Sequence, residues 1–379
     1  MLAETEFMRL CLRLARRGYG TTSPNPMVGA LLVKRGQIIG RGWHHRAGEP
    51  HAEIEAFRDA QRHGHDPQGA TLYVSLEPCC TRGRTPPCTD AIIQSDVRRV
   101  VVGSIDPNPH HAGRGLVILR RAGVSVKSGV LAEECTRLNE AFNHWIIERA
   151  PFVTVKAAMT LDGKIATLSG ESKWITGKPA RAYAMKLRAG SDAIVVGIST
   201  VLADDPSLTV RTTKRQNRNE HRPRRIVLDA KARTPLDAKV VSDEFSNLTT
   251  IVVTSEAPQS RLQALSKKVR VMLAPGRGGR INLRWLLKKL GSENVTSLLV
   301  EGGGEVNASF LFSRLAQRIA FFYAPKILGG ANSRKAVAGN GAKSLKGALD
   351  LIEPQWRRLG EDWFLSARIG TKSEFRKQV

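Results

Sequence analysis

The sequence predicts an α/β protein made of two consecutive domains. Its 379 residues are too many for one ordinary core, since a domain usually holds about 100–200 residues. Short segments rich in Val, Ile and Leu alternate with helical patterns along most of the chain, which is typical of a sheet covered by helices. The polar segment Glu148–Pro151 ends in proline, so we place the boundary there and expect domains at 1–148 and 149–379.

The first domain is expected to contain a mixed sheet. Its first 18 residues carry apolar side chains at helical spacing and predict an amphipathic helix rather than a signal peptide. Residues 27–34 and 37–44 flank a turn at Arg35-Gly36 and predict a β-hairpin. The elements expected next are a helix at about 51–64, a strand at 70–78, a helix from about Pro87, a strand at 97–105, a helix near 115–122, a strand at 124–129 and a helix that ends near Ile147.

The second domain shows the same alternation and predicts a second α/β sheet. Its strands are expected at 152–160, 193–200, 224–230, 249–255, 269–275, 297–301, 319–328 and 362–369. Its helices are expected near 178–189, 258–267, 281–290 and 305–315.

The composition of the chain indicates the cellular compartment in which we expect the protein. No apolar run approaches the roughly 20 residues that a bilayer-spanning helix needs, so we expect no membrane partner. Five cysteines in a chain of this length do not form a secreted disulfide framework, so we expect a cytoplasmic protein. Cys11 and Cys135 lie in predicted helices and are expected to be buried.

The formal net charge of +25 leaves two alternatives, nucleic-acid binding or anionic small-molecule substrates. The basic residues are spread along the chain, and the one dense run, at 212–225, is polar and typical of a solvated loop. No aromatic RNA-binding signature accompanies that run. We therefore expect an anionic small-molecule partner and no nucleic acid.

One set of residues in the first domain predicts a catalytic zinc site. His51 and Glu53 open a helix, Cys79 follows a strand and a proline, and Cys88 follows two prolines. One imidazole and two thiolates leave the fourth position of zinc for water, and zinc lowers the pKa of bound water to about 7. Glu53 is then the candidate proton carrier, because H-x-E followed by P-C is typical of zinc nucleobase deaminases. The alternative is a buried cysteine cluster with a surface histidine.

The cysteine spacing departs from the short-spaced nucleobase deaminases. Eight residues separate Cys79 from Cys88, and position 82 is Arg where a second cysteine would be usual. Cys80 is badly placed to share the site of Cys79, so we assign it no role. Four other histidines in loops are expected to be solvated: His63, His65, His110 and His111.

Four segments of the first domain resemble the deaminase half of the bifunctional riboflavin-biosynthesis deaminase/reductase: SPNPMVGA (23–30), GWHHRAGEPHAE (42–53), LEPCCTRGRTPPC (76–88) and DPNPHHAGRG (106–115). In that family the long insertion between the cysteines is normal. The resemblance implies a cytidine-deaminase-like α/β/α domain with zinc on His51, Cys79 and Cys88, and Glu53 as proton shuttle. It also implies a substrate site near Asn25, His44, Arg84 and Thr85.

In the second domain, a strand runs into three glycines and then a helix at 297–311. Such a turn lets backbone amides approach a phosphate, although a tight turn without a ligand remains an alternative. Asp204-Asp205-Pro206 could be a capped surface turn, and Trp174 could be a core anchor or a flat surface for a ring.

Four segments of this domain, LDGKIA (161–166), GESKWITG (170–177), STVLADDPSLTVR (199–211) and VEGGGEVNASFL (300–311), resemble the reductase half of the same enzyme. That half is similar in fold to dihydrofolate reductase and uses NADPH. The residues that the resemblance places near NADPH are Ala158, Trp174, Thr200, Asp204, Gly303, Gly304, Glu305, Val306, Asn307, Ala308 and Ser309. Those that it places near the ribose phosphate substrate are Ser172, Arg188, Leu208, Arg211 and Glu301.

Together the two resemblances imply a bifunctional riboflavin-biosynthesis enzyme. Zinc-dependent deamination of 2,5-diamino-6-ribosylamino-4(3H)-pyrimidinone 5′-phosphate would precede NADPH reduction of its ribosyl group to ribityl phosphate. Glu301, Asp204 and water are the candidate proton donors of the second step, and we expect a homo-oligomer. The alternative is a tRNA base deaminase with a reductase-like RNA-binding domain.

Overall fold

The computed structural model describes residues 3–82, 86–211 and 222–370, which form two compact units, Met1–Arg149 and Ala150–Val379. Arg84, Thr85 and positions 212–221 of the basic run lie outside the described residues. Across the described ranges, none of the helices combines the length and apolar character that crossing a bilayer requires. All five cysteines are free thiols, and Cys11 and Cys135 are fully buried, as expected.

The first unit is a three-layer α/β/α structure around a five-stranded sheet in the order β2-β1-β3-β4-β5. β1 pairs antiparallel with β2 and β3, whereas β3, β4 and β5 run parallel, so the predicted mixed sheet is confirmed. Its elements are α1 (Glu4–Ala15), β1 (Gly29–Lys34), β2 (Gln37–Trp43), α2 (Ala52–Arg62), β3 (Thr71–Leu76), α3 (Cys88–Gln94), β4 (Arg99–Ser104), α4 (Arg114–Arg121), β5 (Ser125–Ser128), α5 (Ala132–Leu138) and α6 (Glu140–Glu148).

Alternating side chains of the strands separate the two apolar layers of this unit. Leu32, Val74 and Val102 pack against α2, α3 and α4 on one face of the sheet. Leu31 and Tyr73, their neighbours in sequence, pack against α1 on the other face. This period of two is what a strand buried on both faces requires.

The second unit contains a nine-stranded sheet in the order β11-β10-β9-β8-β14-β6-β15-β18-β17. The strands from β11 to β15 run parallel, and β18 and β17 add antiparallel at one end. The strands of this sheet are β6 (Phe152–Thr160), β8 (Ala193–Gly197), β9 (Arg224–Leu228), β10 (Thr249–Val253), β11 (Arg270–Leu273), β14 (Ser297–Val300), β15 (Arg318–Ala324), β17 (Leu351–Leu359) and β18 (Asp362–Ile369).

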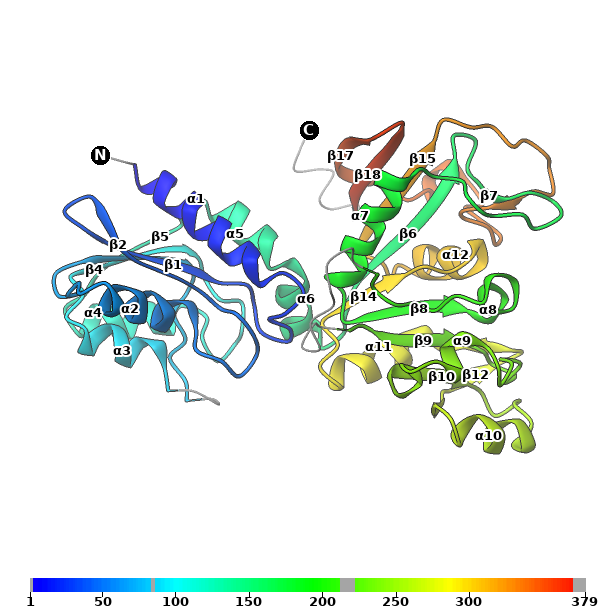
Figure 1. Ribbon diagram of the computed structural model, residues 1–379, viewed down its shortest axis with the longest axis horizontal. Helices are drawn as coiled ribbons and strands as arrows, with labels where there is room; N and C mark the ends of the chain where they lie inside the picture. The colour runs from blue at the N-terminus through cyan, green and yellow to red at the C-terminus, as the bar shows by residue number, and fades with distance from the viewer. Residues whose placement is uncertain (1–2, 83–85, 212–221, 371–379) are drawn as a thin grey trace. The chain divides into compact units, whose positions relative to one another are not determined.

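Helices cover both faces of this sheet. One apolar layer joins the sheet to α11 and α12, and the other joins it to α8, α9 and α10. In Figure 1 the sheet runs from β17 near the top of this unit, through β6 and β8, to β10 near the bottom. The helices are α7 (Lys178–Ala189), α8 (Ile198–Asp204), α9 (Lys239–Ser242), α10 (Gln259–Ser266), α11 (Leu283–Ser292) and α12 (Gly304–Phe312).

Two expected elements differ from the structure, and one observed strand was not expected. The strand expected at 193–200 ends at Gly197, because the chain turns there into α8. The helix expected to end near Ile147 is two helices, α5 and α6. β17 was not expected, because its nine residues are mostly exposed and include Pro354.

Candidate active sites

Three potential metal ligands meet in the first unit. His51 directly precedes α2, Cys79 follows β3, and Cys88 opens α3. The Nδ1 atom of His51 lies 3.5 Å from Sγ of Cys79 and 3.3 Å from Sγ of Cys88. A tetrahedral zinc ion with ordinary Zn–N and Zn–S bonds would separate nitrogen from sulfur by about 3.6 Å. The donor set and its spacing therefore fit zinc.

A cavity of about 170 Å³ is lined by two of these ligands, His51 and Cys79. His44 and Asn25 line it, and Nε2 of His44 is 3.1 Å from Nδ2 of Asn25. Glu53 lines it too and is only 3% exposed. Burial raises the pKa of Glu53 to about 7, although the nearby His51 acts in the opposite direction. The cavity thus brings an acid–base group and the potential metal ligands together, with His44 and Asn25.

The segment 106–115 supplies a wall of this cavity that the sequence analysis did not assign. Asp106, Asn108 and His111 line the cavity, and His111 is buried. The expectation that His111 is solvated is therefore wrong. Its ring packs beside Cys80, whose Sγ is 3.5 Å from Nδ1 of His111. Cys80 remains outside the cluster of three metal ligands.

The buried carboxylate of Glu77 ties this segment to the end of β3. It accepts hydrogen bonds from the backbone N–H groups of Asp106 (3.1 Å), Gly113 (2.9 Å) and Gly115 (2.9 Å). A carboxylate that accepts several backbone N–H groups stabilises a loop strongly. Glu77 thus holds one wall of the cavity two residues away from Cys79.

We expect Glu77→Gln to lower the free energy of unfolding by about 1.5–3 kcal/mol, because the amide presents N–H groups to backbone donors that need an acceptor. Calorimetric unfolding of the full chain measures this change. Glu133→Gln, at an exposed glutamate on α5, is the matched control and should stay within about 0.5 kcal/mol. Equal effects of the two substitutions would contradict the role of Glu77.

In the second unit, two adjoining cavities of about 870 and 770 Å³ lie along the ends of β8, β9 and α12. They share Ile198, Leu228, Glu305 and Val306. Of the residues expected near NADPH or substrate, the first cavity is lined by Ser172, Thr200, Asp204, Gly303, Gly304, Glu305 and Val306. The second is lined by Glu305, Val306, Ala308 and Ser309, together with the cationic side chains of Lys231, Arg233 and Arg280. The first cavity also has cationic lining residues, Arg334 and Lys335. Two adjoining cavities with cations in their walls fit a phosphorylated dinucleotide.

The glycines before α12 have two different roles. A Cβ on Gly304 would come within 2.3 Å of the carbonyl oxygen of Lys335, so only glycine fits there. A Cβ on Gly303 would meet only Thr200 Oγ1, at 3.8 Å, because Gly303 borders the first cavity. Close packing against Lys335 therefore explains why position 304 is a glycine. At position 303 the backbone itself is open to the first cavity, so a ligand in that cavity can approach it.

A buried ion pair lies at the end of β14. Arg188 donates from Nε and Nη2 to the two carboxylate oxygens of Glu301, at 2.8 and 2.7 Å. Nζ of Lys156 lies 3.7 Å from the same carboxylate. Burial alone would raise the pKa of Glu301, but the charges of Arg188 and Lys156 outweigh it and lower the pKa to about 2. Glu301 is therefore ionised near neutral pH.

The remaining residues predicted for the reductase site differ in their burial and in their hydrogen bonds. Asp204 accepts a hydrogen bond from Ser172 at 3.0 Å, which joins two of the predicted segments. Trp174 is 63% exposed, so it is not a core anchor. Leu208 and Asn307 are buried, and Asn307 donates to the carbonyl of Ala336. Ala158 in β6 is half-buried, and Arg211 is exposed.

Residues 151–365 match the family described as RibD C-terminal domain, and residues 1–104 match the cytidine and deoxycytidylate deaminase zinc-binding region. The riboflavin biosynthesis protein RibD of Actinobacillus pleuropneumoniae is 44% identical over 96% of this chain and 95% of its own length.

The chain belongs to the RibD family.

Two solved structures show the same family over the whole chain. Acinetobacter baumannii RibD superimposes with a TM-score of 0.85, at 34% identity, over 97% of this chain and 99% of that one. A Thermotoga maritima diaminohydroxyphosphoribosylaminopyrimidine deaminase/5-amino-6-(5-phosphoribosylamino)uracil reductase has a TM-score of 0.81, at 34% identity, over 97% and 98%.

Membership of the RibD family confirms the expected fold class and the bifunctional deaminase and reductase of riboflavin biosynthesis. Zinc is the metal of the deaminase unit and NADPH the cofactor of the reductase unit, and the residues present fit both. The tRNA deaminase alternative is not supported, because the second unit is a RibD reductase domain.

Proposed function

We propose that this chain deaminates 2,5-diamino-6-ribosylamino-4(3H)-pyrimidinone 5′-phosphate and then reduces the ribosyl group of the product to ribityl phosphate. The name of the Thermotoga maritima protein, 34% identical over 97% of this chain, supports both substrates. The observation that carries the first step is the cavity that holds Glu53 next to His51 and Cys79.

For the deamination we propose that His51, Cys79 and Cys88 hold zinc and that Glu53 moves protons. Zinc supplies a water molecule of lowered pKa as the nucleophile. The Glu53 carboxylate, which lines the same cavity, would take a proton from this water and deliver it to the departing amino nitrogen. This assignment rests on the position of Glu53, which lies in the same cavity as two of the ligands.

We propose that Asn25 and His44 orient the pyrimidine ring. Their mutual contact of 3.1 Å, and the contact of Nδ1 of His44 with the carbonyl of Pro50 at 3.1 Å, fix both side chains at the cavity wall. Arg84 and Thr85 are proposed to bind the ribose phosphate, as an arginine suits a phosphate. These two residues lie outside the described part of the chain.

For the reduction, NADPH supplies the hydride and the protein supplies orientation and charge. We propose that cofactor binding uses Ala158, Trp174, Thr200, Asp204 and the segment Gly303–Ser309. Ser172, Arg188, Leu208, Arg211 and Glu301 are proposed to hold the ribose phosphate. Because Glu301 is ionised near neutral pH, it is a hydrogen-bond acceptor for sugar hydroxyls and not the proton donor. The candidate donors that remain are Asp204 and water.

A coupled assay tests the proposed order of steps. The purified protein with zinc, NADPH and the diaminopyrimidine ribosyl phosphate should release ammonia before NADPH oxidation begins. NADPH oxidation without prior ammonia release would contradict the order, and ammonia release from RNA alone would contradict the substrate.

Cys80→Ser should leave the zinc content and the deamination rate within about twofold of wild type, because Cys80 contacts His111 and not the metal ligands. Zinc analysis of the purified variant and an ammonia-release assay measure both quantities. A loss of zinc would show that Cys80 is a ligand after all.

We also propose that the chain works as a homo-oligomer in the cytoplasm. The exposed edge strand β17 and its Trp356, which is 57% exposed, offer a surface to a second copy. Five free thiols support a reducing compartment. Light scattering that returns the mass of one chain, 41.5 kDa, would contradict the oligomer.

A further inference from the structure

The largest fully buried polar side chain of the second unit is that of Arg225 on β9, which is 1% exposed. A guanidinium group has five N–H donors, and all five are used here. Nη1 and Nη2 each donate to the carboxylate of Asp243, at 2.7 and 2.8 Å, and Nε donates to Oγ1 of Thr249 at 2.8 Å. The other two donate to the carbonyls of Ser207 (2.9 Å) and Val240 (3.1 Å).

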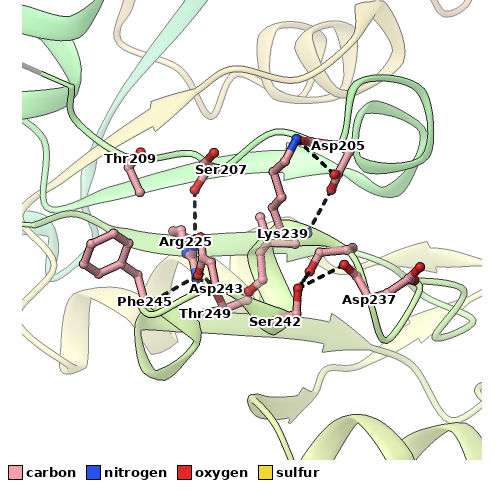
Figure 2. Close-up of polar contacts among 12 residues, drawn as sticks. Asp205, Ser207, Thr209, Arg225, Asp237, Lys239, Ser242, Asp243, Phe245 and Thr249 are labelled. Carbon is pink, nitrogen blue, oxygen red and sulfur yellow. Dashed lines mark hydrogen bonds and ion pairs between the residues drawn. The ribbon is translucent and has the colours of Figure 1, made fainter.

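Figure 2 shows the direction of these contacts. Asp243 and Thr249 lie on the side of α9 and β10, and their bonds fix the guanidinium within the core of the unit. The bond to Ser207 points the opposite way, toward the segment that follows α8. Arg225 therefore connects the region of α9 and β10 to the backbone of the segment 205–211 at Ser207.

That segment needs an external support. Asp205 and Leu208 have φ angles of 41° and 51°, in the left-handed region that non-glycine residues rarely adopt. Such conformations persist only where the surroundings impose them, and they concentrate at functional sites. The segment has no regular structure of its own beyond Asp204.

Two further groups hold the same segment. Arg188 donates from Nη1 to the carbonyl of Thr209 at 3.0 Å, two residues after Ser207. The backbone N–H of Lys239 donates to Asp205 Oδ1 at 2.8 Å, and its Nζ lies 3.2 Å from Oδ2 (Figure 2). Arg188 and Arg225 thus bind alternate carbonyls, and the buried side chain of Leu208 anchors the residue between them.

We propose that Arg225 is a positioning residue of the reductase site, which holds Ser207 so that the backbone of Leu208 and the exposed Arg211 are placed for the substrate. This inference rests on the proposed function, because that function places Leu208 and Arg211 at the ribose phosphate. Arg225 itself is buried and does not line either cavity of this unit. It acts through the backbone that it holds.

The test compares three variants of the full-length protein, loaded with zinc. Arg225→Lys keeps a positive charge but cannot span Asp243 and Ser207 at once, because a lysine lacks the planar five-donor fork. Asp243→Asn weakens the two bonds that hold the guanidinium of Arg225 at the end of α9. It is the milder change, since the side chain of Asp243 is 22% exposed. Thr249→Val is the matched control, because it removes the Nε contact and the bond from the Thr249 hydroxyl to the carbonyl of Val240, but leaves the bonds of Arg225 to Asp243 and Ser207.

We expect Arg225→Lys to raise KM for the deaminated substrate by about tenfold or more, with kcat of the reductase changed by less than about threefold. Equilibrium binding of ribose 5-phosphate, measured by calorimetry, should weaken by the same factor. Asp243→Asn should act in the same direction, and Thr249→Val should leave both quantities unchanged. The deamination rate of the same chain should not change in any variant.

An unchanged KM in a folded Arg225→Lys protein would overturn the proposal, and so would a fall in kcat alone. If Arg225→Lys does not fold, the result for Asp243→Asn decides in the same way. Arg211→Ala distinguishes a failure of the proposed substrate site from a failure of the positioning role of Arg225. If Arg211→Ala leaves KM unchanged, the proposed substrate site is wrong. If it raises KM and the Arg225 and Asp243 variants do not, only the positioning role fails.

Discussion

Replacing Glu53 by glutamine is expected to lower the rate of deamination by a factor of about 10²–10⁴, while zinc stays bound. Glutamine keeps the size of the side chain in a position that is 3% exposed, so the cavity wall should not collapse. It cannot take up or deliver a proton at the position that Glu53 occupies beside the metal ligands. Ammonia release measures the rate, and metal analysis of the purified protein measures the zinc.

The second unit supplies the internal control for this experiment. NADPH oxidation with the deaminated substrate should continue at its normal rate, because Glu53 belongs to the first compact unit. Cys88→Ser is the contrasting variant and should lose zinc together with deamination, since it removes a thiolate from the cluster of three ligands. If Glu53→Gln lost zinc in the same way, Glu53 would support the metal site and would not be the proton carrier.

The metal site could be predicted from local sequence because two of its three ligands mark the start of a helix and the third follows a strand and a proline. His51 directly precedes α2, and Cys88 begins α3 after two prolines, so the ends of these helices were visible in the sequence. The opposite wall of the cavity was not visible in this way. Asp106 and His111 line it, in a loop whose backbone N–H groups donate to Glu77. Hydrogen bonds from one side chain to distant backbone groups leave no periodic pattern in a sequence.

In the reductase unit, too, the features that depend on residues distant in sequence could not be predicted. Its buried parallel strands are continuous apolar runs and were predictable, whereas the exposed edge strand β17 was not. Arg225 is the second of two arginines at the start of β9, where a charged pair usually marks the solvated end of a strand. Its burial depends on Asp243 and Thr249, which are 18 and 24 residues further along. Tertiary partners of this kind decide which charges a core can hold.

Arg188→Met is expected to lower the free energy of unfolding by about 3–5 kcal/mol at pH 7, because it leaves the buried carboxylate of Glu301 with only Lys156 as a cation. Arg270→Met is the matched control. Arg270 also makes a two-bond pair, with Glu293, but it is 45% exposed, and its loss should cost about 1 kcal/mol or less. Calorimetric unfolding of the full chain measures both.

The stability that Arg188→Met loses should depend on pH, and the lowered pKa of Glu301 gives the direction. The pKa of Glu301 is lowered to about 2 from an ordinary value of 4.5, so its ion pair stabilises the fold above pH 4.5 and that stabilisation disappears as the pH falls toward 2. Without Arg188, burial raises the pKa of Glu301. Protonation at low pH then removes the buried negative charge that destabilises the variant. The difference between wild type and Arg188→Met should therefore shrink between pH 7 and pH 3.

The double variant Arg188→Met/Glu301→Met separates stability from function. Replacing both members of a buried pair by apolar side chains is often close to neutral, so most of the lost stability should return. Reduction should nevertheless stay impaired, because the substrate site would lack both the cation and the carboxylate that we propose for the ribose phosphate, and Thr209 would lack its donor. Recovery of reductase activity together with stability would mean that the pair only supports the fold, and that other groups in the two adjoining cavities bind the substrate.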